Sequence, residues 1–270
     1  MKLWDEDSLF SDEYNAIVMV EYQHELELVK MLIYVAEEGI ERKAVNNIWS
    51  YEGICYAFAK AIVKYSKMAY DNFILGHTDA VNMINRVVLE NCVFLDIIVN
   101  NEELELWKYY IAHSYRSILC KKHKELHQKE MDSLNEMYHS FHFSEEFYVK
   151  QENQKKAYIS MPYGWTYKIN KDFSFSGVCK LVGEAEYMGF KLMSEYSHGT
   201  SLYLKIFSSI FEENIMNMLV SLYIELYRMV ILFCYDTVDE SFDEIAEELE
   251  SIFYRYIAYE EEVFGNNKPA

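Results

Sequence analysis

The chain has 270 residues, and its 25 Lys and Arg against 44 Asp and Glu give a formal net charge of −19. Such an acidic excess excludes a protein that coats nucleic acid, because that binding depends on cations that displace the counterions of the phosphates. Hydrophobic residues make up 51% of the sequence and only 2 Pro and 9 Gly interrupt it, which excludes a disordered chain and disfavours a sandwich or barrel. Long helices are expected instead.

The first half of the chain predicts four helices. Ser11 can cap a helix over about 12–38, with Gly39 as its stop. A second helical pattern runs over about 43–73, and Thr78 can cap a third helix over 79–99. A fourth helix begins at Glu102 and extends to about 141, with a charged and solvated second half.

An irregular segment over 143–175 separates these helices from the rest. It contains a dense group of aromatic residues that should pack as an ordered loop. Helices are then predicted over 176–183, 184–198, 201–235 and 239–264. The chain is thus expected to be all-α, a single bundle of seven to eight helices. Its segments would be 1–75, a core over 76–235, and an acidic C-terminal helix over 236–270 packed on the core.

The expected compartment and cofactors are judged from the cysteines, the N-terminal residues and the most apolar window of the sequence. Its 5 Cys are widely spaced and form no Cys-x-x-Cys pair, so neither a disulfide framework nor a thiolate zinc site is expected. The chain opens with acidic residues where a secretory signal needs basic ones. The apolar window 216–235 includes Glu225 and Arg228 and is interpreted as a core helix. We expect a cytoplasmic protein with no membrane contact, metal or cofactor.

Two helix faces carry polar residues among apolar ones. On the helix over 79–99, Glu90 shares a face with Met83, Val87, Phe94 and Ile97, and Arg86 lies one turn before Glu90. On the helix over 184–198, Ser194 and His198 follow the same spacing as the apolar Phe190. If the two faces meet, Arg86, Glu90, Ser194 and His198 form one polar network. It would either hold packed helices in register or provide an acid or base at His198, oriented by Glu90, with Arg86 for an anion.

These polar residues also carry a resemblance to a known family. The spacing Arg86-x-x-x-Glu90, followed by Ser194-x-x-x-His198-Gly199, resembles the bacterial domain-of-unknown-function family numbered 5677 over about residues 79–225. Between these motifs lie Tyr163-Gly164-Trp165 and Glu186-Tyr187, in the order of that family. The resemblance implies an all-helical fold and draws attention to Tyr163, Trp165 and Tyr187, but it implies no reaction.

A second candidate site is Arg116 with His123, which have six residues between them and are similar to the Arg and His of HEPN-class ribonucleases. In that reading paired subunits would cleave RNA without metal. His123 and His127 have a spacing found in metal sites, but neighbouring lysines would repel a cation, so a solvated helix face is the simpler interpretation.

The function favoured by the sequence is binding or regulation. The family resemblance suggests that this takes place in bacterial stress or phage defence. A protein partner is expected, and homo-oligomers are a further option. The first alternative is a metal-independent ribonuclease toxin, the one case in which RNA would be a partner. The second is an acidic decoy or inhibitor of a basic partner, because residues 236–262 hold eleven carboxylates against Arg255 alone.

Overall fold

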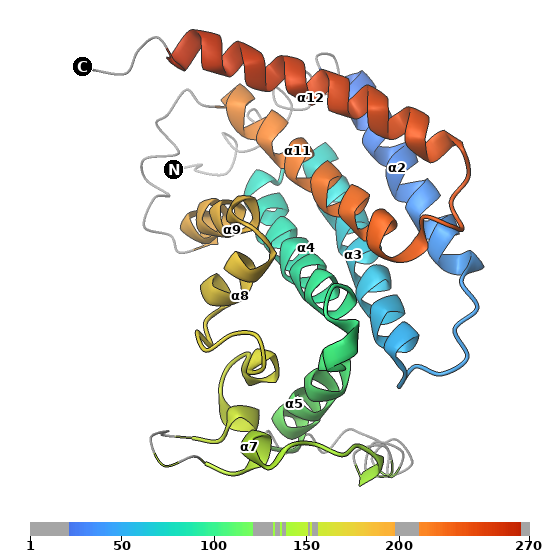
Figure 1. Ribbon diagram of the computed structural model, residues 1–270. Helices are drawn as coiled ribbons and strands as arrows, with labels where there is room; N and C mark the ends of the chain where they lie inside the picture. Colours follow the sequence, from blue (N-terminus) through green and yellow to red (C-terminus); the bar gives the residue numbers. More distant parts are fainter. Residues whose placement is uncertain are drawn as a thin grey trace, which may run out of the picture. The chain divides into compact units, whose positions relative to one another are not determined.

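The computed structural model describes residues 22–120, 132, 136, 139–150, 152, 156–197 and 211–265. Within these residues the chain is helical and contains no β-strand, so the predicted all-α class is confirmed (Figure 1). The elements are α2 (Gln23–Arg42), α3 (Tyr51–Ile74), α4 (Thr78–Val99), η1 (Glu102–Leu104), α5 (Leu106–Cys120), α7 (Glu145–Tyr148), η2 (Tyr158–Ser160), η3 (Gly164–Thr166), α8 (Phe175–Val182), α9 (Glu184–Ser197), α11 (Phe211–Met229), η4 (Val230–Cys234) and α12 (Ser241–Gly265).

The chain forms two compact units. Unit 1 comprises residues 1–44, 58–92 and 191–270, and unit 2 comprises residues 45–57 and 93–190. Three helices, α3, α4 and α9, therefore contribute residues to both units. This division cuts across the three consecutive segments expected from the sequence.

Unit 1 is built on α2, α11 and α12, which lie side by side and pack against one another (Figure 1). Their shared interior is apolar: Leu32 of α2, Leu226 of α11 and both Phe242 and Leu249 of α12 are fully buried. Each of these helices is amphipathic, with carboxylates on the outside of α12 at Asp243, Glu244, Glu247 and Glu250. Burial of these stripes removes apolar surface from water, which is the main force that holds such helices together.

Gly39 does not stop the first helix, because α2 continues through it to Arg42. The glycine is buried, and a Cβ placed on it would lie 2.6 Å from Val238 Cγ1. Thr237 strengthens the same contact, since its hydroxyl donates to the Gly39 carbonyl over 2.7 Å. Gly39 is thus required for the close approach of the segment after η4, and the expected stop at this glycine is wrong.

The second helix starts later than predicted. Residues 44–50 are not helical and end in a turn, where Asn47 Oδ1 accepts from the Trp49 amide over 2.9 Å and Ser50 Oγ accepts from the Gly53 amide over 3.1 Å. These side chains satisfy amides that a helix start leaves unpaired, so α3 begins at Tyr51. The apolar spacing over 43–50 did not reveal that side chains compete with the helix for these backbone amides.

Unit 2 is organised around aromatic side chains. Phe147, Trp165 and Tyr167 are buried, and rings from α5, α7, η2 and Tyr167, the residue after η3, contact one another at centroid distances of 4.7 to 5.5 Å. The segment over 143–175 therefore packs as an ordered part of the unit, through the short helices α7, η2 and η3. Edge-to-face contacts of this kind add to the gain from area burial.

One helical stretch of the described residues, Met216–Cys234, is long and apolar enough to cross a membrane, and half of it is buried inside the protein. Its last turn, η4, is a π-helix that ends at the buried Cys234. Burial raises the pKa of the Cys234 thiol to about 12. This cysteine is therefore a packed core residue that resists ionisation.

Candidate functional site

Arg86 and Glu90 both lie on α4, within unit 1, and both are partly exposed. The face that carries Glu90 is not buried along its whole length, because Met83 is 51% exposed and Val87 is partly exposed. Phe94 and Ile97, further along the same face, are buried. Glu90 therefore lies where the face passes from solvent to interior, and a carboxylate there does not carry the full cost of burial.

The partners predicted for this pair are only partly within the described structure. Ser194 is in helix α9, as expected, but the described side chains do not include it. His198 lies outside the described residues. The four-residue network of Arg86, Glu90, Ser194 and His198 stays a prediction.

The candidate ribonuclease pair, Arg116 and His123, is likewise not within the described side chains. Arg116 is in the last turns of α5, in a stretch whose side chains are not described, and His123 lies outside the described residues. No His, Cys, Asp or Glu group that could hold a metal ion occurs among the described residues.

The aromatic motif Tyr163-Gly164-Trp165 is a packing element of unit 2. Trp165 is 1% exposed, and its ring lies edge-on to those of Phe94 and Tyr110, at 5.4 Å in each case. A Cβ on Gly164 would lie 1.8 Å from the Tyr158 carbonyl oxygen, so only glycine fits. Tyr163 adopts φ 51°, a left-handed conformation that a bulky residue takes only under constraint from its surroundings. The motif positions a tight turn against α5.

The second motif, Glu186-Tyr187, begins α9. Glu186 is a buried carboxylate in the first turn, where the helix dipole favours negative charge. It folds back on Gly183, since a Cβ on that glycine would lie 2.4 Å from Glu186 Oε2. Tyr187 is partly exposed, with Lys180 Nζ 4.4 Å from its ring centroid. Both residues serve the junction between α8 and α9.

Buried polar side chains also join α4 to α11, and the sequence analysis did not single them out. Asn85 Nδ2 donates to the Met218 carbonyl over 3.2 Å, and Cys92 Sγ donates to the Glu225 carbonyl over 3.5 Å. Asn85 and Cys92 are seven residues apart, so they lie on one face of α4. That spacing was the signal in the sequence from which a shared polar face could have been predicted. Hydrogen bonds to the backbone of a neighbouring helix fix how the two helices pack.

The most unusual surface of unit 1 is the outward face of α11 and η4. Ile224, Ile231 and Tyr235 are 44%, 46% and 50% exposed, and Tyr227 is exposed between them. Together with Asn217 and Val220 they follow helical spacing, and the partly buried Arg228 is the one charged residue at the same spacing between residues 217 and 235. Helix faces in contact with water are normally polar, so a face on which four large apolar or aromatic side chains are exposed together indicates a surface that another molecule covers.

Carboxylates border this face on the side of α12. Tyr235 donates to Asp243 over 3.2 Å, a hydrogen bond that raises the tyrosine pKa. Tyr227 stacks on Phe242 with centroids 5.6 Å apart, and Tyr223 lies near Glu250, whose charge adds to the effect of burial in raising the Tyr223 pKa. We call Ile224, Tyr227, Ile231 and Tyr235, with Asp243, Glu250 and the exposed Tyr254 of α12, the α11–α12 face.

The described residues define an all-helical protein with an aromatic unit and a helical unit that exposes an apolar, acid-bordered face. Residues 52–214 match the sequence profile of the family of unknown function DUF5677, and the chain belongs to that family. Both aromatic motifs and α4 fall inside the matched residues, whereas α12 and most of α11 lie beyond them. No curated protein and no solved structure gave a significant match.

Proposed function

We propose that this chain is a binding protein whose α11–α12 face takes up a basic, amphipathic helix of a partner protein. The observation that carries the proposal is the group of exposed apolar and aromatic side chains on α11 beside the carboxylates of α12. A partner helix would place apolar side chains on Ile224 and Ile231 and Lys or Arg side chains toward Asp243 and Glu250. Helix-in-groove recognition uses this combination of apolar anchors and flanking charges.

Charge favours a basic partner helix over a second copy of the chain and over a membrane surface. A second copy of the chain would bring together two acidic surfaces, each from a chain of charge −19. An anionic membrane surface would be repelled by the same carboxylates. A basic segment is attracted by them, and this agrees with a role as a regulator or decoy of a basic partner. We place this role in the cytoplasm and in bacterial stress or phage defence.

Fluorescence anisotropy with a labelled model peptide tests the proposal. The peptide contains only Leu and Lys in an amphipathic helical pattern, and its matched control replaces every Lys with Glu. The Leu/Lys peptide should bind, more weakly as salt is raised, because exposed charge pairs are screened. The Leu/Glu peptide should not bind.

The double variant Ile224→Ser/Ile231→Ser locates the site. Each isoleucine has almost half of its surface left to bury, worth about 1 kcal/mol, so the double variant should bind about 30-fold more weakly. Met31→Ser, at an exposed methionine of α2, should leave the affinity unchanged. Equal binding by the double variant and the unmodified chain would contradict the proposal.

The ribonuclease alternative has its own test with the same protein. RNA incubated with the chain should remain intact under the binding proposal. Cleavage that disappears in Arg116→Ala or His123→Ala would favour the ribonuclease instead.

A further inference from the structure

Three exposed carboxylates form a row along α12, within unit 1, at Asp243, Glu247 and Glu250. Their spacing of four and three residues places them on the same side of the helix. Among the residues that the structure describes, none of the three forms an ion pair with a Lys or Arg. Like charges this close repel one another, so a cationic group of a partner is attracted to the row.

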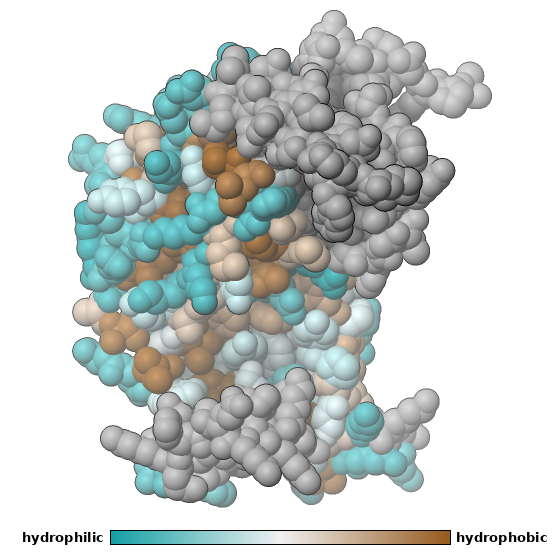
Figure 2. Space-filling view, turned by 180° about the vertical axis from the view of Figure 1, so that it is seen from behind, coloured by the Kyte–Doolittle hydropathy of each residue, from teal (hydrophilic) through white to brown (hydrophobic). Residues whose placement is uncertain are grey.

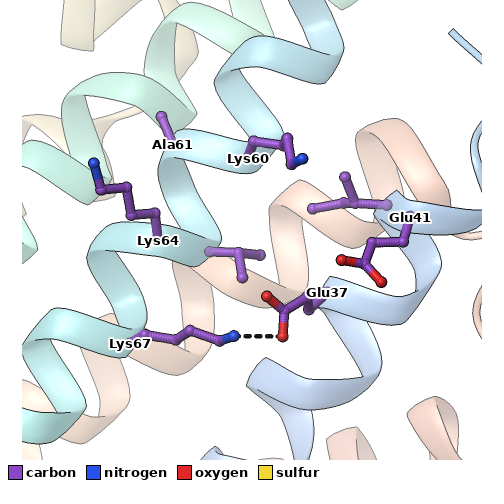
Figure 3. A pocket seen from close by; sticks show the side chains of 8 residues that line it. Glu37, Glu41, Lys60, Ala61, Lys64 and Lys67 are labelled. Carbon is purple, nitrogen blue, oxygen red and sulfur yellow. Dashed lines mark hydrogen bonds and ion pairs between the residues drawn. The ribbon is translucent and has the colours of Figure 1, made fainter.

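Neither exposed apolar surface nor exposed carboxylates are enough by themselves to identify a cation site. Hydrophobic side chains are exposed between hydrophilic ones on the face shown in Figure 2 as well. Carboxylates also line a hollow between α2 and α3, but Lys60, Lys64 and Lys67 line the same hollow and Lys67 pairs with Glu37 (Figure 3). Those lysines repel a cation, whereas the row on α12 attracts one.

Exposed tyrosine rings lie beside both ends of the row. At one end, the Tyr235 hydroxyl donates to Asp243 over 3.2 Å, and this tyrosine is 50% exposed. At the other end, Tyr254 follows Glu250 by one helical turn and is 64% exposed. Each terminal carboxylate of the row therefore has a phenol ring next to it that a partner can still cover.

Tyr223 and Tyr227 of α11 connect the two ends. Tyr227 stacks on Phe242, the residue before Asp243, and lies 5.8 Å from the ring of Tyr223. Burial, followed by the proximity of Glu250, Tyr227 and Tyr254, raises the pKa of Tyr223. The far end of the row thus lies close to α11, and a partner seated on α11 can reach both ends.

A phenol ring beside a carboxylate favours a guanidinium over an ammonium. The guanidinium is planar and weakly hydrated, stacks on aromatic rings, and donates two N–H groups to one carboxylate. An ammonium pairs with the carboxylate too, but it is strongly hydrated and carries no planar surface for the ring. Arginine and lysine therefore differ most in affinity where both groups are present.

The row also has the same period as the apolar part of the face. Asp243 and Glu250 are seven residues apart, which is two turns or about 10 Å along α12, and Ile224 and Ile231 have the same separation on α11. A partner helix that lies along both helices meets each pair once in every two turns. Its cations must recur every seven positions to reach Asp243 and Glu250 together.

We propose that the α11–α12 face selects arginine over lysine in the partner helix, at two positions seven residues apart. This inference rests on the proposed function of the face. One guanidinium would pair with Asp243 and stack on Tyr235, and the other would pair with Glu250 and stack on Tyr254.

Fluorescence anisotropy with the full chain and three peptides tests the selection. The first is the Leu/Lys peptide, the second carries Arg in place of two Lys seven residues apart, and the third carries the two Arg five residues apart, on different sides of the helix. The second peptide should bind about fivefold more tightly than the first, and the third should gain less than half of that. If the Leu/Lys peptide binds and the second peptide binds no more tightly, the selection is refuted and the proposed function stands. If no peptide binds, the proposed function fails.

Variants locate the selection on the tyrosines. Tyr235→Leu/Tyr254→Leu keeps apolar bulk at two exposed positions and should remove the preference for the second peptide, while the Leu/Lys peptide still binds. Tyr254→Leu alone should reduce the preference to about twofold. Tyr34→Leu, at an exposed tyrosine of α2, should leave it at about fivefold. A full preference in Tyr235→Leu/Tyr254→Leu, with helicity retained by circular dichroism, would overturn the inference.

Discussion

Trp165→Ala tests whether the family's aromatic motif is part of the core. The indole is 1% exposed and lies 5.4 Å from the rings of Phe94 and Tyr110. Removal of a fully buried Trp costs about 3–5 kcal/mol, from lost burial and the cavity left behind. For a chain of this size each kcal/mol shifts Tm by about 2–4 °C, so the Tm should fall by roughly 6–20 °C.

Thermal unfolding followed by circular dichroism measures this shift. Tyr34→Ala is the control, because this tyrosine of α2 is 59% exposed and its removal should change stability by no more than about 0.5 kcal/mol. Gly164→Ala should destabilise as well, since its Cβ would collide with the Tyr158 carbonyl. A Tm within 2 °C of the unmodified chain for Trp165→Ala would refute the structural role of the motif.

Three further experiments test other parts of unit 1. Iodoacetamide at pH 8 should modify Cys234 far more slowly in the native chain than in urea, because burial raises its pKa to about 12; equal rates would show that the thiol is accessible. Asn85→Ala should lower the free energy of unfolding by about 1–3 kcal/mol through loss of the bond to Met218, and the larger Asn85→Leu should cost less, as measured by urea unfolding. The Lys43 ammonium, 2.5 Å away, lowers the pKa of Asp236, so this pair stabilises the fold above the unfolded-state pKa and its contribution is lost as pH falls through the folded-state pKa. Asp236→Asn should therefore lower Tm slightly at pH 7, and the difference from the unmodified chain should shrink as the pH is lowered.

Helix type and number were largely readable from the sequence, and helix ends were not. Apolar spacing located α4 and α12 to within about two residues, and Gly183 separates α8 from α9 as predicted. Gly39 was misread because its reason for being glycine is the tertiary contact with Val238, which leaves no local signal. The start of α3 was misread because Asn47 and Ser50 compete for backbone amides.

The candidate surface was harder to predict than the fold. High hydropathy over 216–235 led to the interpretation of a core helix, which holds for Leu226 but not for the opposite side, where Ile224 and Ile231 meet solvent. Spacing shows that these two residues share a face, yet only the packing of α2, α4 and α12 determines which face of α11 is covered. The structure also has a hollow of about 510 Å³ between α2 and α3, which was not predicted because it depends on how two separate helices pack.

Hydroxyl-radical footprinting of the full chain, with and without the Leu/Lys peptide, tests the binding proposal most directly. The method reports the solvent access of individual side chains. The peptide should reduce the oxidation of Tyr227, Tyr235 and Tyr254 on the α11–α12 face and leave the exposed Tyr34 of α2 unchanged. Unchanged oxidation of the three tyrosines while the peptide is bound would contradict the account.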